Sequence, residues 1–203
     1  STVALMPAVT RGPTDATING IQIDIDRSSP DALGSITVVG TETVVVTGVD
    51  PPVFVIPVPA GSTTGDVLFC TVVANVTITG TPAGWTQIAK TQPRSGEDML
   101  LLYRLATGAE PANYTITFDG GGNHGVGSIT TRRGVDLTTV IDVTPVAGTA
   151  VTSGTTVTAP TLTTVTAGAR LVSAFAARTG NAAFSTPAGM TERMDSSDTA
   201  VYT

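Results

Sequence analysis

Short runs of β-branched residues, separated by glycine and proline, recur through most of this chain and constrain its fold more than any other feature. Thr accounts for 38 of the 203 residues, and 22 Gly and 13 Pro interrupt the runs. Branching at Cβ suits a pleated strand, whereas Gly and Pro supply turns. The pattern predicts an all-β fold, specifically an antiparallel β-sandwich of the jelly-roll type. The expected strands span residues 35–39, 43–47, 53–58, 66–79, 85–91, 98–105, 113–118, 126–133, 155–158, 161–165, 169–177 and 190–194.

The first 34 residues differ from the rest, because turn residues here surround a single short strand. Ile21, Ile23 and Ile25 alternate with polar residues and so share one face of that strand. The segment is too short to fold alone, but it can add a strand to a sheet of its own chain or of a neighbour. We therefore expect an extended N-terminal arm over 1–34, with the three isoleucines as assembly contacts. The sandwich domain is expected over 35–203.

The turn sequence Thr-Pro-Ala-Gly occurs twice, at 81–84 and at 186–189, which indicates two halves built on one plan. Proline fixes φ and glycine supplies a positive φ, so each copy should form a tight turn. Trp85 and Met190 follow the two turns, and we expect both to enter the core as equivalent plugs. The strands after the first turn lack counterparts after the second. We therefore expect a sandwich that is incomplete at its C-terminal end, so that either the chain continues beyond Thr203 or strands are borrowed.

The charge pattern excludes several classes of protein. The formal net charge is −6 and Lys90 is the only lysine, whereas a nucleic-acid-binding face needs clustered basic residues. Arg132 and Arg133 form the one adjacent basic pair, which we interpret as a solvated or ion-paired turn. No stretch approaches the roughly 20 apolar residues of a membrane-spanning helix. We expect neither a nucleic-acid partner nor a membrane partner.

Residues that usually carry catalysis or bind metals are scarce. His124 is the only histidine and is expected to be exposed in a glycine-rich loop, and Cys70 is the only cysteine and is expected to be buried and inert. These counts exclude the usual zinc sites. Asp24 and Asp26 alternate on a strand and with Asp31 could hold calcium, but solvent-facing carboxylates are the favoured interpretation. We expect no enzyme activity, no metal and no cofactor.

Exposed aromatic side chains are what a carbohydrate-binding surface requires, and few are present here. Trp85 and Tyr103 are the candidate glycan contacts, since each offers an apolar ring and a polar group. Trp85 also has the alternative role of a core plug after its turn, and we favour that role for it. Tyr103 has no such competing assignment.

A series of turns and strand starts follows the chain in this order: Pro59-Ala60-Gly61, Gly65-Asp66-Val67-Leu68, Pro82-Ala83-Gly84-Trp85-Thr86, Leu102-Tyr103-Arg104-Leu105-Ala106-Thr107-Gly108-Ala109-Glu110-Pro111, Tyr114-Thr115-Ile116-Thr117-Phe118, Arg133-Gly134-Val135-Asp136, Ile141-Asp142 and Pro187-Ala188-Gly189-Met190-Thr191. This order resembles the β-sandwich domain of minor tail and other virion proteins of actinobacterial phages, which also occurs in some secreted bacterial proteins. The resemblance covers roughly residues 53–197. That domain usually continues with a final apolar strand and lacks the arm.

The resemblance implies a structural protein of a phage virion, in the tail or on the capsid surface, that acts by self-assembly and surface presentation. Its partners would be copies of itself and other virion proteins, with host surface glycans as a further candidate, and its location would be the virion. A charged fraction of only 13% fits a surface that makes extensive protein contacts. The alternative is a secreted carbohydrate-binding or adhesive module, located extracellularly or on a cell surface. The resemblance implies no catalytic residue.

Overall fold

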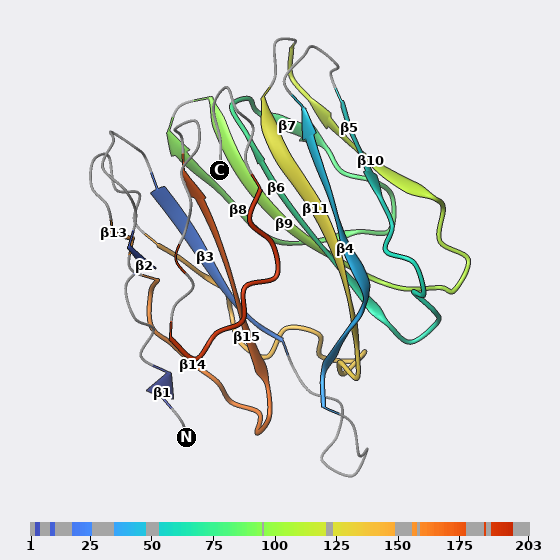
Figure 1. Ribbon diagram of the computed structural model, residues 1–203, viewed down its shortest axis with the longest axis vertical. Helices are drawn as coiled ribbons and strands as arrows, with labels where there is room; N and C mark the ends of the chain where they lie inside the picture. The colour runs from blue at the N-terminus through green and yellow to red at the C-terminus, as the bar shows by residue number, and fades with distance from the viewer. Residues whose placement is uncertain are drawn as a thin grey trace.

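The computed structural model describes residues 3–4, 9–10, 18–25, 35–47, 53–94, 96–120, 124–148, 156–157, 159–177, 185 and 188–196. These residues form strands and loops without a helix, and the strands pair antiparallel (Figure 1). The predicted all-β antiparallel sandwich is therefore confirmed. The described part of the chain holds no helix that could cross a membrane.

A five-stranded sheet lies at the centre of the molecule (Figure 1). Its strands are, in spatial order, β4 (Thr37–Thr47), β11 (Gly125–Arg133), β6 (Val67–Ala74), β9 (Glu97–Leu105) and β8 (Thr86–Arg94). In β6 and β9 the apolar residues are consecutive rather than alternating, and most of them are buried. Consecutive apolar residues are typical of a strand that is covered on both faces.

One face of the central sheet packs against a three-stranded sheet with the order β5 (Val53–Pro57), β10 (Asn113–Phe118) and β7 (Ile78–Gly80). Burial alternates along β10, so that Ile116 is buried while Thr115 is exposed. Phe54 and Phe118 meet edge to face with ring centroids 4.7 Å apart. The inner cluster between these two sheets includes Phe54, Ile56, Leu68, Cys70, Leu100, Leu102, Ile116 and Ile129.

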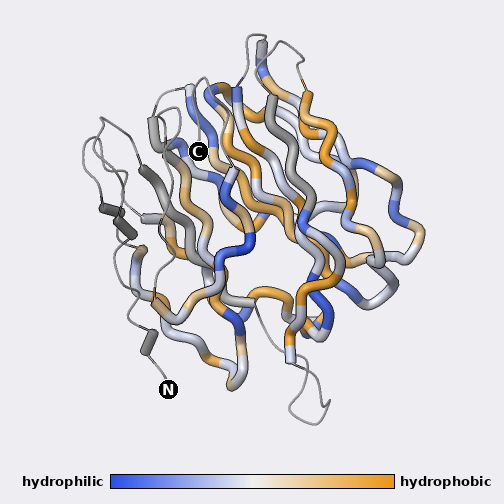
Figure 2. The backbone as a smooth tube through the Cα atoms, in the orientation of Figure 1, coloured by the Kyte–Doolittle hydropathy of each residue, from blue (hydrophilic) through white to orange (hydrophobic). Residues whose placement is uncertain are grey.

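The opposite face of the central sheet packs against a second three-stranded sheet, with the order β12 (Val146–Ala147), β3 (Ile18–Ile25) and β15 (Arg170–Ala177). Alternate residues of β15 meet apolar residues of the central strands. The outer cluster between these layers includes Val67, Phe69, Val73, Met99, Leu101, Val172, Ala174 and Ala176. Figure 2 shows the apolar colour concentrated along the strands and the hydrophilic colour mainly on connecting segments. The sandwich therefore has a third layer, which the sequence pattern left unassigned.

The segment predicted to be an arm contributes the central strand of that outer sheet. In β3, Ile21 pairs with Ala174 and Ile23 with Val172, while β12 pairs along the other side of β3. Of the two roles that the sequence allowed for this strand, the structure shows pairing within its own chain. The side chains of the three isoleucines lie outside the described part, and their role as assembly contacts stays a prediction.

Most predicted strands occur within a few residues of their expected bounds. The strands expected at 35–39 and 43–47 form the single strand β4, and two further predictions differ in an informative way. The expected strand 66–79 is divided into β6 and β7, because β6 pairs with β9 and β11 whereas β7 pairs with β10 of the facing sheet. Residues 190–194 are irregular, so the strand expected there was wrong. A strand requires a hydrogen-bonded neighbour, and none pairs with this segment in the described structure. The strands expected at 155–158 and 161–165 occur as β13 (Thr156–Val157) and β14 (Leu162–Thr163). Their partners, β2 (Val9–Thr10) and β1 (Val3–Ala4), were not predicted.

The turns that precede β6 and β15 have the same backbone geometry. Before β6, the amide of Asp66 donates to the carbonyl of Thr63 at 3.1 Å, and before β15 the amide of Ala169 donates to Thr166 at 3.3 Å. The glycine between the bonded residues has φ of 91° in the first turn and 85° in the second. Both strands have eight residues, so β6 and β15 begin from equivalent turns. The tertiary environments differ, since β6 has a strand on each side and β15 pairs with β3.

Neighbouring leucines of β9 provide a test of the third layer. Leu101 belongs to the outer cluster and Leu102 to the inner cluster, and each is 1% exposed. We expect Leu101→Ala and Leu102→Ala each to lower the free energy of unfolding by about 2–5 kcal/mol, because both leave a cavity. Leu105→Ala, at a position 42% exposed, should cost less than about 1 kcal/mol in the same urea titration. If Leu101→Ala were as mild as that control, the outer layer would not be packed as described.

Candidate functional site

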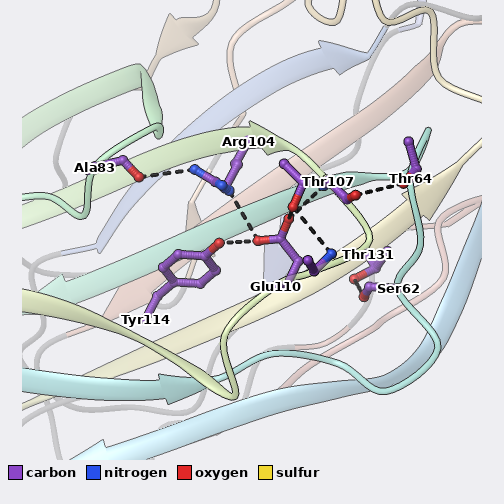
Figure 3. A network of polar contacts seen from close by, with 9 residues as sticks. Ser62, Thr64, Ala83, Arg104, Thr107, Glu110, Tyr114 and Thr131 are labelled. Carbon is purple, nitrogen blue, oxygen red and sulfur yellow. Dashed lines mark hydrogen bonds and ion pairs between the residues drawn. The ribbon is translucent and has the colours of Figure 1, made fainter.

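A hydrogen-bond network centred on Glu110 joins β9 to β10 (Figure 3). The carboxylate accepts bonds from the amide of Thr107 at 2.7 Å, from the Thr107 hydroxyl at 2.9 Å and from Nε of Arg104 at 3.1 Å. It also accepts a bond from the hydroxyl of Tyr114. With only 5% of its side chain exposed, Glu110 is a buried charge that is fully compensated within the fold.

The same network holds the turn that precedes β8. Nη1 of Arg104 donates to the carbonyl of Ala83 at 3.0 Å, and its guanidinium lies 5.5 Å from the centroid of the Tyr114 ring. Trp85 meets the Tyr114 ring edge to face, with centroids 5.0 Å apart. The Pro-Ala-Gly-Trp turn and the loop after β9 are therefore joined through Arg104 and Tyr114.

The pKa values of Glu110 and Tyr114 are shifted in opposite directions. Burial would raise the pKa of Glu110, but the hydrogen bonds from Thr107 and Tyr114 and the charge of Arg104 together bring it below its usual value. Burial and the neighbouring Glu110 carboxylate raise the pKa of Tyr114 to about 12. Glu110 therefore remains an acceptor and Tyr114 a donor over the neutral range. Such a pair acts as a structural tie, since an acid–base couple needs pKa values near the working pH.

A second loop has the same Thr-x-x-acid pattern. Asp66 accepts bonds from the amide and hydroxyl of Thr63, as Glu110 does from Thr107. The Thr64 hydroxyl donates to the carbonyl of Thr107 at 2.7 Å and so connects the two loops. Sequence reasoning singled out neither Asp66 nor Glu110 for a role. The repeated spacing of threonine and an acid, with glycine between them, was the signal that could have found both.

Asp66 also forms an ion pair with Arg133. Nε of Arg133 lies 2.7 Å from one carboxylate oxygen and Nη2 lies 2.8 Å from the other, a bidentate arrangement. Burial opposes ionisation of Asp66, yet the bonds from Arg133 and Thr63 outweigh it and lower its pKa. The ion-paired interpretation is thus confirmed for Arg133, although the residue ends strand β11 rather than lying in a turn.

A third buried carboxylate, Asp98, connects three strands. Its side chain is fully buried and accepts bonds from the amide of Ile78 at 2.6 Å, from Nζ of Lys90 at 2.8 Å and from Nε2 of Gln92 at 2.8 Å. These partners belong to β7 and β8, while Asp98 belongs to β9. The only lysine of the chain therefore serves to hold two sheets together.

Glu42 on β4 differs from these three carboxylates. Both of its carboxylate oxygens are buried, and they have no hydrogen-bond partner among the described residues. Burial raises its pKa, although the charges of Arg132 and Arg193 oppose the increase. Arg193 belongs to the described C-terminal segment, so this electrostatic contact relates that segment to the edge strand of the central sheet.

The two predicted core plugs are both half-buried. Trp85 packs against the inner cluster, and its Nε1 is buried without a hydrogen-bond partner in the described structure. A buried ring nitrogen cannot donate to a sugar, so Trp85 is poorly placed as a glycan contact. Met190 follows a turn whose glycine has the same φ, 81°, as the glycine before Trp85.

The second candidate glycan contact, Tyr103, lies on the other face of the central sheet. Tyr103 packs against the outer cluster, whereas its neighbour Leu102 belongs to the inner cluster. Trp85 and Tyr103 therefore cannot form one binding platform. Tyr103 instead lines a groove at the seam between the central sheet and the outer layer, together with Gln87 and Thr144.

The single cysteine and the single histidine of the chain lie in different environments. Cys70 is 2% exposed within the inner cluster, as predicted, and burial raises its pKa to about 12. His124 is half-buried rather than exposed, because its backbone exchanges two hydrogen bonds with Asn75. Asp26 and Asp31 lie outside the described residues. Within the described residues, no three His, Cys, Asp or Glu side chains are grouped as metal ligands would be.

Comparisons with models of protein families, with curated proteins and with solved structures find no match. The similarity to virion β-sandwich domains therefore stays a prediction from the sequence.

The charge of Glu110 should matter to stability in a pH-dependent way. Its folded-state pKa is lowered, so its contribution is present above the unfolded value of about 4.3 and is lost as the pH falls through the folded value. We expect Glu110→Gln to lower the free energy of unfolding by about 1–3 kcal/mol at pH 7. The difference from the unmodified protein should shrink at pH 3, measured by urea denaturation, while Asp119→Asn at an exposed carboxylate should change little at either pH. An equal loss at both pH values would show that packing rather than charge is responsible.

Gly84 and Gly189 have the same φ, but only Gly84 lies against Arg104. Substituting each of them distinguishes the cost of backbone strain from the cost of displacing Arg104. A Cβ at Gly84 would lie 2.0 Å from Nη1 of Arg104, whereas a Cβ at Gly189 would have no atom within 4 Å. Alanine at φ of 81° should cost about 1–2 kcal/mol at either position. Gly84→Ala should cost about 1–3 kcal/mol more, because Arg104 must leave its partners. In an Arg104→Ala background the two costs should converge, and urea titrations in which they stayed apart would contradict this account.

Proposed function

We propose that this protein is a structural component of a phage virion, in the tail or on the capsid surface, and that it acts by self-assembly and by presenting its sandwich outward. The proposal starts from the resemblance of its turns and strand starts to virion sandwich domains. In the fold, those motif residues form the ties around Glu110 and Asp66. The observation that carries the proposal is that the residues of the sequence motifs are also the residues that cross-link the loops by hydrogen bonds. Cross-linked loops suit a protein that acts through its shape.

A neutral sheet face supports association of copies. On β5 and β10 the residues that point away from the inner cluster include Val55, which is 47% exposed, and the exposed Thr115 and Thr117. No charged residue occurs within these two strands. The chain has a net charge of −6, so repulsion between copies is weakest where a neutral face meets another. We therefore assign the contact between copies to the outer face of β5 and β10.

The assembly part of the proposal is tested with one charge substitution and a matched control. Thr115→Glu adds a negative charge to the neutral face, whereas Thr163→Glu adds the same charge at an exposed threonine of β14. Light scattering after size exclusion should show an oligomer for the unmodified protein and for Thr163→Glu. Thr115→Glu should be shifted toward the monomer by at least about tenfold in dissociation constant. A monomer at all concentrations would contradict self-assembly.

The virion location requires a separate measurement. Antibodies against this chain should label particles purified from a lysate of cells that carry its phage, and labelled particles imaged by electron microscopy would show tail or capsid. Absence of the chain from such particles, measured by mass spectrometry with a known virion protein as the control, would overturn the proposal.

A further inference from the structure

The groove beside Tyr103 lies where the edge of the central sheet meets the connection to the outer layer. It has a volume of about 380 Å³, at the lower end of the range for ligand sites. One wall is formed by β8 and β9, and the other by the segment 141–145 that leads into β12. The groove is lined by Gln87, Ile88, Tyr103, Ile141, Asp142, Val143, Thr144 and Pro145.

Both walls are held in place by the fold. On β8, the pairing with β9 shifts register between Gln87 and Ala89, a bulge that inserts Ile88. Gln87 and Ile88 line the groove, and Ile88 and Ala89 both pack against the outer cluster. Bulges of this kind redirect side chains next to functional sites. On the other wall, Asp142 accepts bonds from the amides of Val165 and Thr166 and from the Thr166 hydroxyl. A ligand would therefore meet a surface that is already ordered.

Three of the polar residues that line this groove have neutral side chains. The side chains of Gln87, Tyr103 and Thr144 form no hydrogen bond within the described structure, in contrast to the tied carboxylates elsewhere. They offer an amide, a phenol and a hydroxyl, each of which can both donate and accept. Around them, Ile88, Ile141 and Pro145 supply apolar surface.

We propose that this groove binds a neutral sugar unit of a glycan. A pyranose ring has an apolar face of C–H groups, which fits against the Tyr103 ring and the aliphatic wall, and a rim of hydroxyls, which fits the amide of Gln87 and the hydroxyl of Thr144. The site uses none of the residues assigned to contacts between copies. It is independent of the virion proposal and would function equally in a secreted protein.

The charge of the lining selects against acidic ligands. No Lys or Arg lines the groove, and its one ionisable acid is Asp142. A phosphate, a sialic acid or a nucleotide would bring a negative charge into a lining that contains an acid and no Lys or Arg, which disfavours binding. A neutral hexose or N-acetylhexosamine meets no such cost.

The test compares neutral and acidic sugars on the full chain. ¹⁵N-labelled protein is titrated with maltotriose, cellotriose and chitotriose, with sialyllactose as the acidic sugar and with a proline-rich peptide as a competing class of ligand. We expect at least one neutral trisaccharide to bind with a dissociation constant below about 10 mM and to shift the amide signals of Gln87 and Thr144. Absence of neutral binding, or preferential binding of sialyllactose or of the peptide, would overturn the proposal.

Substitutions at three groove positions then locate the site: Gln87 and Thr144 are exposed, and Tyr103 is half-buried against the outer cluster. Gln87→Ala and Thr144→Ala should each weaken binding about two- to tenfold, since each removes one hydrogen-bonding group. Tyr103→Phe should retain most of the affinity, and Tyr103→Leu should lose more, because only the former keeps the ring. Thr163→Ala, at an exposed position of β14 outside the groove, is the matched control and should leave binding unchanged. If none of the three groove substitutions changed the affinity, the sugar would bind elsewhere and the assignment would be refuted.

Discussion

Burial of the central sheet on both faces is the constraint on which the rest of this molecule depends. Successive residues of β9 alternate between the inner and outer clusters, so neither face can be left to solvent. The outer layer must therefore be assembled from distant parts of the chain, β3 near one end and β15 near the other. A strand from the predicted arm thus forms part of the sheet that covers this face.

Three buried carboxylates accept several hydrogen bonds each, and each of them connects a loop or strand to its neighbour. Glu110 ties the loop after β9, Asp66 ties the turn before β6 to the end of β11, and Asp98 joins three strands. Breaking one partner would leave an uncompensated buried charge, which costs far more than the pair contributes. Glu42 is the exception, because its carboxylate oxygens have no hydrogen-bond partner among the described residues. It lies within electrostatic reach of Arg193, in the C-terminal segment that forms no strand pairs in the described structure.

The two functional surfaces proposed here lie on opposite sides of the central sheet. The neutral face of β5 and β10 belongs to the layer over the inner cluster, and the groove beside Tyr103 belongs to the side of the outer cluster. A protein with this arrangement can associate through one side and leave the other side accessible. That division suits surface presentation, in which the contact with copies and the contact with a ligand must not compete.

The sequence by itself determined the strands, the turns and the all-β class, because strand periodicity and positive-φ glycines are properties of a few adjacent residues. It also indicated the common plan of the two halves, since Gly84 and Gly189 have the same φ. Only the tertiary structure decided which strands pair, as at 66–79 and 190–194, and which charges meet, as with Asp66 and Arg133. These contacts join residues far apart in the chain. Alternation along a strand predicts which side chains share a face, but it does not predict which other strand packs against that face. For the same reason the sequence could nominate both Trp85 and Tyr103 for one glycan site, whereas the packing separated them and brought Gln87 and Thr144 to Tyr103.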